Sequence, residues 1–232
     1  MAVAYNSSKI VTDGLVFALD AANIQSYPRS GTTWTETTRT GITGTLVNSP
    51  TYVSANGGYF SFDGINDYCS LSSPPNIAGA AATFCVWNYG ILAQNSSIIW
   101  IGAPLGNRMF QVHLPWSGNV IYFDAGNVNS ASESYDRISK GVTNAEYQGW
   151  HHWTFIKNST AGTMSIYRNG TLWHSGSGLS MPVGQPGYGY IGGLSNIYFH
   201  NGYISNLQFY NRALSQTEIQ QNYNAHRSRF GV

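Results

Sequence analysis

Charged residues are scarce in this sequence. They make up 9% of the 232 residues, against about 25% in a typical globular domain, and 11 basic side chains nearly balance 10 acidic ones. The densest basic segment, which contains Arg227 and Arg229, is too small to neutralise a run of phosphates. We therefore expect no nucleic-acid partner.

Long hydrophobic runs and cysteines are also lacking. No segment approaches the roughly 18 apolar residues that span a bilayer, and the first residues show no basic segment followed by an apolar one. We therefore expect no membrane partner and no secretory signal. Cys69 and Cys85 are too few for a disulfide framework, so buried free thiols are the favoured interpretation and a disulfide between them is the alternative.

The sequence does contain many apolar and turn-forming residues. Hydrophobic residues account for 42% of the chain and aromatic residues for 14%, enough to offset the chain entropy lost on folding. Short segments alternate apolar and polar residues and are separated by Gly, Asn, Pro or Ser, which is typical of a β-sandwich. Leu15, Phe17 and Leu19 are predicted to share one strand face, and Asn169-Gly170 is predicted to form a type I′ hairpin turn.

One helix is predicted near the C-terminus. Ser215 and Glu218 have the spacing of a capping box, which predicts a short helix from about Gln216 to Ala225. No linker or internal repeat divides the chain, so one globular domain is expected. The expected organisation is an N-terminal arm at residues 1–10, a sandwich domain at 11–226 and a C-terminal tail at 227–232.

Four segments occur together in a characteristic order. They are Gly14–Asn23, Phe60–Tyr68, Trp150–Phe155 running on to Tyr167–Gly170, and Gly202–Ser215 with Glu218-Ile219. Together they resemble the laminin G-like jelly-roll family, and Tyr-Asn-Arg-Ala-Leu-Ser at 210–215 is the most specific piece. The resemblance implies an all-β fold, a concanavalin A-like jelly-roll sandwich of two antiparallel sheets with one short C-terminal helix.

A second set of segments resembles virion proteins of tailed phages. The segments are Leu19–Asn23, Ser26–Pro28, Thr33-Trp34, Asn222–Ala225 and Arg229–Val232. This resemblance implies a non-enzymatic late protein of the phage particle surface, a capsid decoration, fibre or cement unit, made in the host cytoplasm without a signal peptide. Its expected partners are other virion subunits, namely capsid or tail proteins, and further copies of itself.

Catalytic residues are not evident. Glucanases of this fold carry two carboxylates in a Glu-x-Asp-x-x-Glu pattern, which is absent here, and Glu133 and Asp136 are the nearest approach to an acidic cluster outside the 63–67 turn. His151 and His152 are adjacent in a predicted strand, so they point to opposite faces and do not suit one metal ion. We expect no enzyme activity.

A structural calcium ion is the only cofactor that the sequence suggests. Asp63, Asn66 and Asp67 form an oxygen-rich turn of the kind that holds calcium in relatives of this fold. The favoured alternative is that these side chains shape a tight turn by bonding to the backbone.

Aromatic side chains in Gly-, Ser- or Pro-rich stretches suggest a surface that binds glycans. Sugar rings stack on aromatic faces, although most aromatic residues of a sandwich belong to its core. The candidates are Trp34, Trp116, Tyr135, Tyr188 and Tyr190. The alternative function is therefore a glycan-binding adhesin that recognises a host surface polysaccharide.

Overall fold

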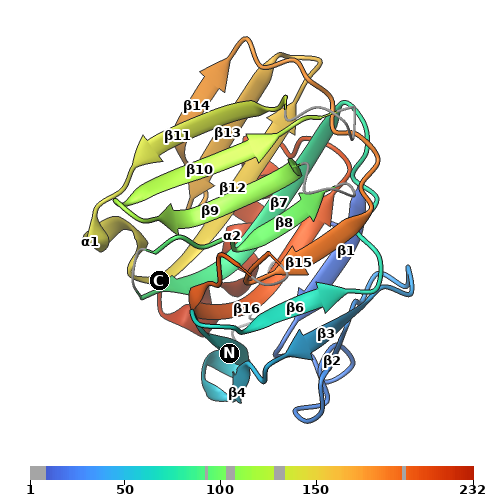
Figure 1. Cartoon of the computed structure of the whole chain (residues 1–232), viewed down its shortest axis with the longest axis vertical. Coiled ribbons are helices and arrows are strands. Elements are labelled where there is room, and N and C mark those ends of the chain that lie inside the picture. Colours follow the sequence, from blue (N-terminus) through green and yellow to red (C-terminus); the bar gives the residue numbers. More distant parts are fainter. Residues whose placement is uncertain (1–8, 92–93, 103–107, 128–133, 195–196) are drawn as a thin grey trace, which may run out of the picture.

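Two antiparallel β-sheets, packed face to face, make up most of the described chain (Figure 1). The computed structural model describes residues 9–91, 94–102, 108–127, 134–194 and 197–232. Residues 1–8 of the expected arm and Glu133 lie outside these ranges. The prediction of an all-β sandwich with a C-terminal helix is confirmed. Among the described residues, no helix combines the length and the apolar character needed to cross a membrane.

The first sheet, here called the covered sheet, carries the C-terminal helix on its outer face. Its hydrogen-bonded order is β14, β13, β12, β7, β16, β5 and β4, and β1 also pairs with β16. These strands are β1 (Leu15–Asp20), β4 (Thr51–Val53), β5 (Tyr59–Asp63), β7 (Ala81–Gly90), β12 (Gly149–Asn158), β13 (Thr163–Arg168), β14 (Thr171–Ser177) and β16 (Asn201–Tyr210).

The second sheet is here called the open sheet, because no long helix formed by the described residues covers its outer face (Figure 1). Its order is β11, β10, β9, β8, β15, β6, β3 and β2. These strands are β2 (Thr33–Thr35), β3 (Thr43–Val47), β6 (Tyr68–Leu71), β8 (Ile99–Gly102), β9 (Arg108–Trp116), β10 (Val120–Ala125), β11 (Asp136–Gly141) and β15 (Tyr188–Ile191). Two short helical segments, η1 (Ala55–Gly57) and α1 (Asn144–Tyr147), lie in connections.

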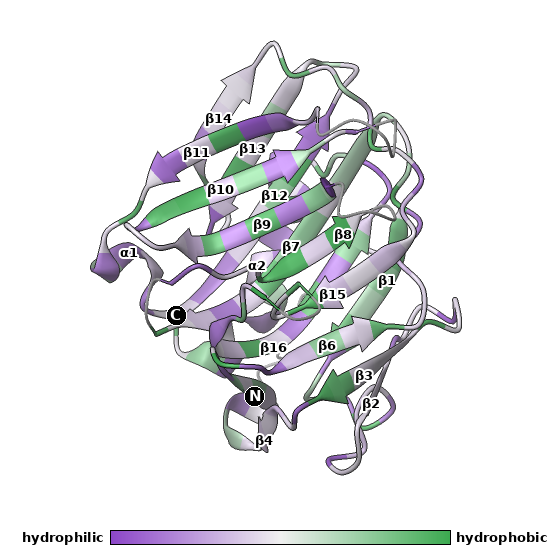
Figure 2. Ribbon diagram, viewed as in Figure 1, coloured by the Kyte–Doolittle hydropathy of each residue, from purple (hydrophilic) through white to green (hydrophobic). Residues whose placement is uncertain are grey.

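Aromatic rings from both sheets meet in the core. Phe84 of the covered sheet lies 6.3 Å from Phe110 of the open sheet, measured between ring centroids, and Phe155 lies 5.5 Å from Phe123. All four side chains are fully buried. Burying a phenylalanine stabilises the fold by about 1.5–3 kcal/mol. Alternating hydrophobic and hydrophilic residues along many strands, seen in Figure 2, follow from the strand's two-residue repeat.

The local predictions for the strands hold with one correction. Asn169 (φ 50°) and Gly170 (φ 79°) both have positive φ between β13 and β14, so the predicted hairpin is confirmed. Phe17 and Leu19 are buried in the core as predicted. The prediction for Leu15 is wrong. A register shift between Leu15 and Phe17 in β1 turns the Leu15 side chain away from the main core. It packs instead against a second cluster, which consists of Val11, Cys85, Ile156, Tyr210, Leu214 and Ile219.

Both cysteines are buried free thiols, as the favoured interpretation predicted. Cys69 belongs to the main core, whereas Cys85 belongs to the cluster beneath the helix. Burial raises the pKa of each thiol to about 12, so neither is ionised at neutral pH.

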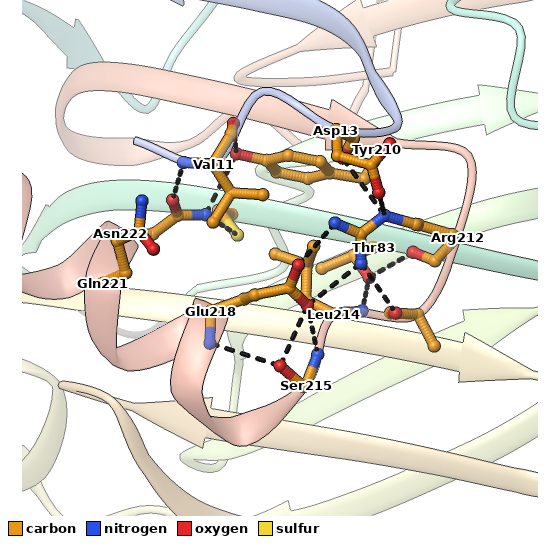
Figure 3. A network of polar contacts seen from close by, with 12 residues as sticks. Val11, Asp13, Thr83, Tyr210, Arg212, Leu214, Ser215, Glu218, Gln221 and Asn222 are labelled. Atoms are coloured by element: carbon orange, nitrogen blue, oxygen red, sulfur yellow. Dashed lines mark hydrogen bonds and ion pairs between the residues drawn. The ribbon is translucent and has the colours of Figure 1, made fainter. Parts of the chain in front are cut away.

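The C-terminal helix α2 (Gln216–Phe230) begins with the predicted capping box. The Ser215 backbone N–H donates to Glu218 Oε2 at 2.8 Å, and Arg212 pairs with the same carboxylate at 2.6 Å (Figure 3). The start of the described chain is tied to α2, because the Val11 N–H donates to Asn222 Oδ1 at 2.8 Å.

The helix is longer than the sequence predicted. It runs past Ala225 to Phe230, so residues 227–230, expected to belong to a tail, form its last turn. The reason is a hydrophobic anchor: the Phe230 ring lies 4.3 Å from Trp87 and 4.5 Å from Trp150, on the outer face of the covered sheet. The helix ends where Gly231 adopts a left-handed conformation.

Candidate binding site

The outward face of the open sheet carries a row of polar and aromatic side chains. Residues that pair across antiparallel strands point to the same face of the sheet. The row contains Arg137, Asp124, Gln111, Trp100, Tyr190 and Ser70. The next residues along these strands, such as Phe123 and Ile101, point into the core instead. This face therefore carries polar and aromatic side chains on the side away from α2, although Asp124, Gln111 and Trp100 in the middle of the row are buried.

A pocket of about 270 Å³ opens at the β9–β11 end of this surface. Strands β9, β10 and β11 supply most of its lining, and Tyr135 and Tyr198 enter from adjoining connections. The lining residues are Arg108, His113, Trp116, Tyr122, Tyr135, Arg137 and Tyr198. Because most of them stand on paired strands, the backbone fixes their positions before any ligand arrives.

Asp124 holds the two arginines of the pocket in place. Its carboxylate is fully buried and accepts two hydrogen bonds from Arg137, from Nε at 2.6 Å and from Nη2 at 2.8 Å. Arg108 Nη1 donates to Asp124 Oδ2, the oxygen that also accepts from Arg137 Nη2, at 2.9 Å and to the Tyr135 hydroxyl at 2.9 Å. The hydrogen bonds that Arg137 donates to Asp124 raise the pKa of Arg137, so this guanidinium stays charged.

The Tyr135 ring lies against both guanidinium groups. Its centroid is 4.9 Å from Arg108 Cζ and 5.2 Å from Arg137 Cζ, while Arg137 also lies 4.9 Å from the Tyr122 ring. These are cation–π distances. The contacts reduce the freedom of two long side chains that are each about one-third exposed, and so they preorganise the pocket.

Aromatic rings form the other end of the pocket. The Trp116 ring lies 4.4 Å from His113 and 5.0 Å from Tyr198, in edge-on arrangements. Tyr198 has φ 60°, which is uncommon for a bulky residue, and its carbonyl accepts a 2.7 Å hydrogen bond from the Ser97 N–H. This strained backbone places the Tyr198 ring beside Trp116.

His113 is a neutral imidazole in this site. Its Nδ1 lies 2.6 Å from the Ser96 carbonyl oxygen, which only accepts, so Nδ1 carries the proton and donates. Burial lowers the pKa of His113 to about 4. The ring is therefore uncharged at neutral pH, and Nε2 is left as a hydrogen-bond acceptor.

Two of the five predicted glycan-binding aromatics, Trp116 and Tyr135, come together in this pocket. Tyr190 lies elsewhere on the same face, 5.8 Å from Trp100, and Tyr188, which is 49% exposed, is on the same strand β15. The prediction for Trp34 is wrong. Its side chain is fully buried, because β2 turns it inward against Phe60 at 4.8 Å.

Five of the seven lining residues were not predicted from the sequence. They are Arg108, His113, Tyr122, Arg137 and Tyr198. A signal was present in β10, where Tyr122 and Asp124 alternate with the buried Ile121 and Phe123, and an acid in such a strand needs a buried partner. Which arginines would supply that partner depends on the pairing of three strands and could not be read from local sequence.

The histidines and the acidic residue that were considered for catalysis or metal binding make contacts that support the fold. His151 Nε2 lies 3.2 Å from the Gln148 carbonyl, whereas His152 packs 5.4 Å from Trp87, so the two imidazoles have separate surroundings as predicted. Asp136, considered with Glu133, bonds instead to the buried Lys157. Within the described residues, no group of three or more His, Cys, Asp or Glu side chains is placed to hold a metal ion.

The predicted calcium turn uses its oxygens for its own backbone. Asp63 Oδ1 accepts hydrogen bonds from the N–H groups of Ile65 at 2.8 Å, Asn66 at 3.2 Å and Asp67 at 3.4 Å. Asp67 Oδ2 accepts from the Asp63 N–H at 3.2 Å. These bonds favour the turn-shaping interpretation, and calcium at Asp63, Asn66 and Asp67 stays a prediction.

Comparison with solved structures shows the same architecture in a group of binding domains. The binding domain of botulinum neurotoxin DC in complex with SialylT has a TM-score of 0.69 at 13% identity, over 91% of this chain and 51% of that one. The botulinum neurotoxin serotype G binding domain scores 0.67 at 16% identity, over 90% and 50%. The binding domain of Paraclostridial Mosquitocidal Protein 1 scores 0.67 at 14% identity, over 91% and 52%.

This chain therefore spans about half the length of these structures, and at such identities the likeness shows a shared fold. Among curated proteins, none matches the sequence. The family profile described as the concanavalin A-like lectin/glucanases superfamily, Laminin_G_3, matches residues 63–220, well over half of the chain. The protein belongs to this laminin G-like family of the concanavalin A-like lectin/glucanases superfamily.

Proposed function

We propose that this protein is a non-enzymatic carbohydrate-binding module whose ligand occupies the pocket at the β9–β11 end of the open sheet. The observation that carries the proposal is the pairing of an aromatic end, built by Trp116 and Tyr198, with a hydrogen-bonding end, built by Arg108 and Arg137. Aromatic walls with a few fixed polar groups are typical of small-molecule sites.

The size and rigidity of the pocket suit recognition of a short part of a glycan. Its volume of about 270 Å³ is slightly below the range of roughly 300–1,000 Å³ that is common for pockets that enclose drug-sized ligands. The carboxylate of Asp124, the acid at this site among the described residues, is buried and bonded to two arginines, so it is not placed to act on a bound sugar. Binding without turnover fits these features.

The first experiment is a glycan array screened with the purified protein and with Trp116→Ala. We expect retention of at least one glycan and a loss of at least tenfold in apparent affinity for the variant, because the stacking surface is removed. Tyr188→Ala is the matched control, since Tyr188 is an exposed aromatic on the same sheet but outside the pocket.

The outcomes show whether the glycan binds in the pocket or elsewhere on the outer face of the open sheet. A larger loss for Tyr188→Ala than for Trp116→Ala would move the site towards β15, and an array without hits would remove the carbohydrate-binding function. Both variants should keep the melting temperature of the parent protein within a few degrees, because neither side chain belongs to the main core.

The setting of this module is proposed to be the surface of a tailed-phage particle, as a decoration, fibre or cement unit that contacts other virion subunits and copies of itself. The support is the sequence resemblance at residues 19–34 and 222–232. Deleting residues 1–10 is expected to abolish incorporation into particles while the isolated sandwich stays folded, because Val11 and the strands that follow are retained. Unchanged incorporation, measured by mass spectrometry of purified particles, would count against the setting.

A further inference from the structure

The polar groups in the pocket are mainly donors. An arginine guanidinium cannot accept a hydrogen bond, and Asp124, the acid beside Arg108 and Arg137, is fully buried behind their ion pairs. Neutral sugars present many hydroxyl protons, which carboxylates and amides usually accept. Among the described lining residues there is neither an exposed carboxylate nor an amide, so a ligand rich in acceptor oxygens fits this lining better.

The two arginines keep donors that the protein does not use. Arg108 bonds through Nη1, and Arg137 bonds through Nε and Nη2. Arg108 Nη2 and Arg137 Nη1 have no hydrogen-bond partner in the part of the chain that the structure describes. Since each side chain is about one-third exposed, these donors are within reach of a ligand in the pocket.

The charge of the site is positive although the whole chain is almost neutral. Two guanidinium groups face one carboxylate, and His113 is neutral, which leaves one excess positive charge among the described groups. The net charge of the full sequence is only +1, so attraction of an anion would be local to the pocket. At physiological ionic strength, screening limits such attraction to about 8 Å.

We infer that the pocket takes an acidic sugar, a uronic or sialic acid residue whose carboxylate bonds to Arg108 and Arg137 while its ring lies against Trp116. This inference rests on the proposed carbohydrate-binding function and names the class of ligand. The two oxygens of the carboxylate can accept one bond from Arg108 Nη2 and one from Arg137 Nη1, and such charge-assisted bonds are roughly twice as strong as neutral ones. The carboxylate thus binds beside the buried Asp124 rather than replacing it.

The test uses pairs of ligands that differ only in the carboxyl group. Galacturonate oligosaccharides and sialyl oligosaccharides are each compared with their carboxyl-reduced forms, in which CH₂OH replaces the carboxylate, by titration calorimetry. We expect at least one acidic ligand to bind tenfold or more tightly than its reduced form, and the difference to shrink as salt is added. Which pair responds identifies the source of the acid.

Variants of Arg108 assign the preference to the pocket. Arg108→Gln removes the excess charge but leaves the two-point bond between Arg137 and Asp124, so the fold is retained and the preference for the acidic form should fall to about twofold or less. Arg108→Lys should keep part of the preference. Arg29→Gln, which makes the same change in net charge at an exposed position outside the pocket, should leave it unchanged.

The results distinguish this inference from the function on which it rests. Equal binding of acidic and reduced ligands, both weakened by Trp116→Ala, would overturn the acidic-sugar inference and keep carbohydrate binding. Binding only to neutral glycans on the array would also overturn the acidic-sugar inference and keep carbohydrate binding. An absence of binding to any glycan would remove both.

Discussion

Arg137 and Asp124 form a two-point ion pair across neighbouring strands β11 and β10, with an Nε–Oδ1 distance of 2.6 Å and an Nη2–Oδ2 distance of 2.8 Å. The two residues are directly opposite in the strand register, so the bond links the edge strand of the open sheet to the next strand. A buried carboxylate is tolerated here because Arg108 completes its set of partners. One residue therefore positions both cationic groups of the proposed binding pocket.

Asp124→Asn should destabilise the protein and weaken ligand binding together. The amide cannot balance two guanidinium groups, and the arginines lose their fixed positions. Because these arginines are partly exposed, we expect a fall in the free energy of unfolding of about 1–3 kcal/mol, measured by urea denaturation. Asp13→Asn is the control, since Asp13 also pairs with an arginine but is 86% exposed, and it should change stability little.

Stability should fall as the pH drops from about 6.5 to about 4. Burial lowers the pKa of His113 and His200 to about 4 and that of His152 to about 3. In this window the unfolded chain binds protons that the folded chain does not, so protonation favours unfolding. Each histidine contributes at most about 1.4 kcal/mol per pH unit. Above pH 6.5 these groups are neutral in both states and should add no slope.

The measurement is urea denaturation from pH 7.5 to 4.5, with His200→Gln as the informative variant. Removing this histidine should reduce the slope below pH 6.5, whatever the change in stability at neutral pH. Carboxylates with lowered pKa values, such as Glu146 and Glu218 at about 2, contribute mainly below about pH 5, so the slope between pH 6.5 and 5 is assigned to the imidazoles. A stability that is flat across the window would contradict the neutral buried state of these imidazoles.

Phe230→Ala should loosen the end of α2. The ring is stacked between helix and sheet, at 4.3 Å from Trp87 and 4.5 Å from Trp150, and its loss leaves a gap. We expect a loss of about 3 kcal/mol in the free energy of unfolding. Val232→Ala, two residues further on and 44% exposed, should be nearly neutral. Equal effects of the two substitutions would mean that the last turn does not anchor the helix.

The fold could be predicted from the sequence because its local signals agree with one another. Asn169-Gly170 defines a hairpin by backbone conformation alone, and Ser215 with Glu218 defines a helix start by hydrogen bonding alone. The extension of the helix from Ala225 to Phe230 was missed because it depends on Phe230 meeting Trp87 and Trp150, which are far away in sequence. The local stop signal, Gly231, lies directly after Phe230.

Only part of the candidate site could be predicted from the sequence. Trp116 and Tyr135 stand in turn-like segments and are partly exposed, whereas Trp34 also stands in such a segment and is fully buried. Trp34 differs from the other two residues because its side chain points into the core. Which face of a strand points into the core depends on the order of the strands in the sheet. The arginines were overlooked for a related reason, since a charge is usually a solvated surface group until pairing across strands brings it to a buried acid.

Tyr135 should act on binding through its ring more than through its hydroxyl. The ring lies 4.9 Å from Arg108 and 5.2 Å from Arg137, whereas the hydroxyl makes one described bond, from Arg108 at 2.9 Å. Tyr135→Ala removes both cation–π contacts, each worth about 0.5–1 kcal/mol at exposed sites, and should weaken binding of the best array glycan about five- to tenfold.

Tyr135→Phe is the matched variant, because it keeps the ring and removes only the hydroxyl. It should retain most of the affinity, and neither variant should lower the melting temperature by more than a few degrees, since Tyr135 is half-buried outside the main core. If the phenylalanine variant loses as much affinity as the alanine variant, the hydroxyl contacts the ligand or holds Arg108 by itself. The ring would then not be what preorganises the guanidinium groups, and calorimetry of the two variants side by side decides between these possibilities.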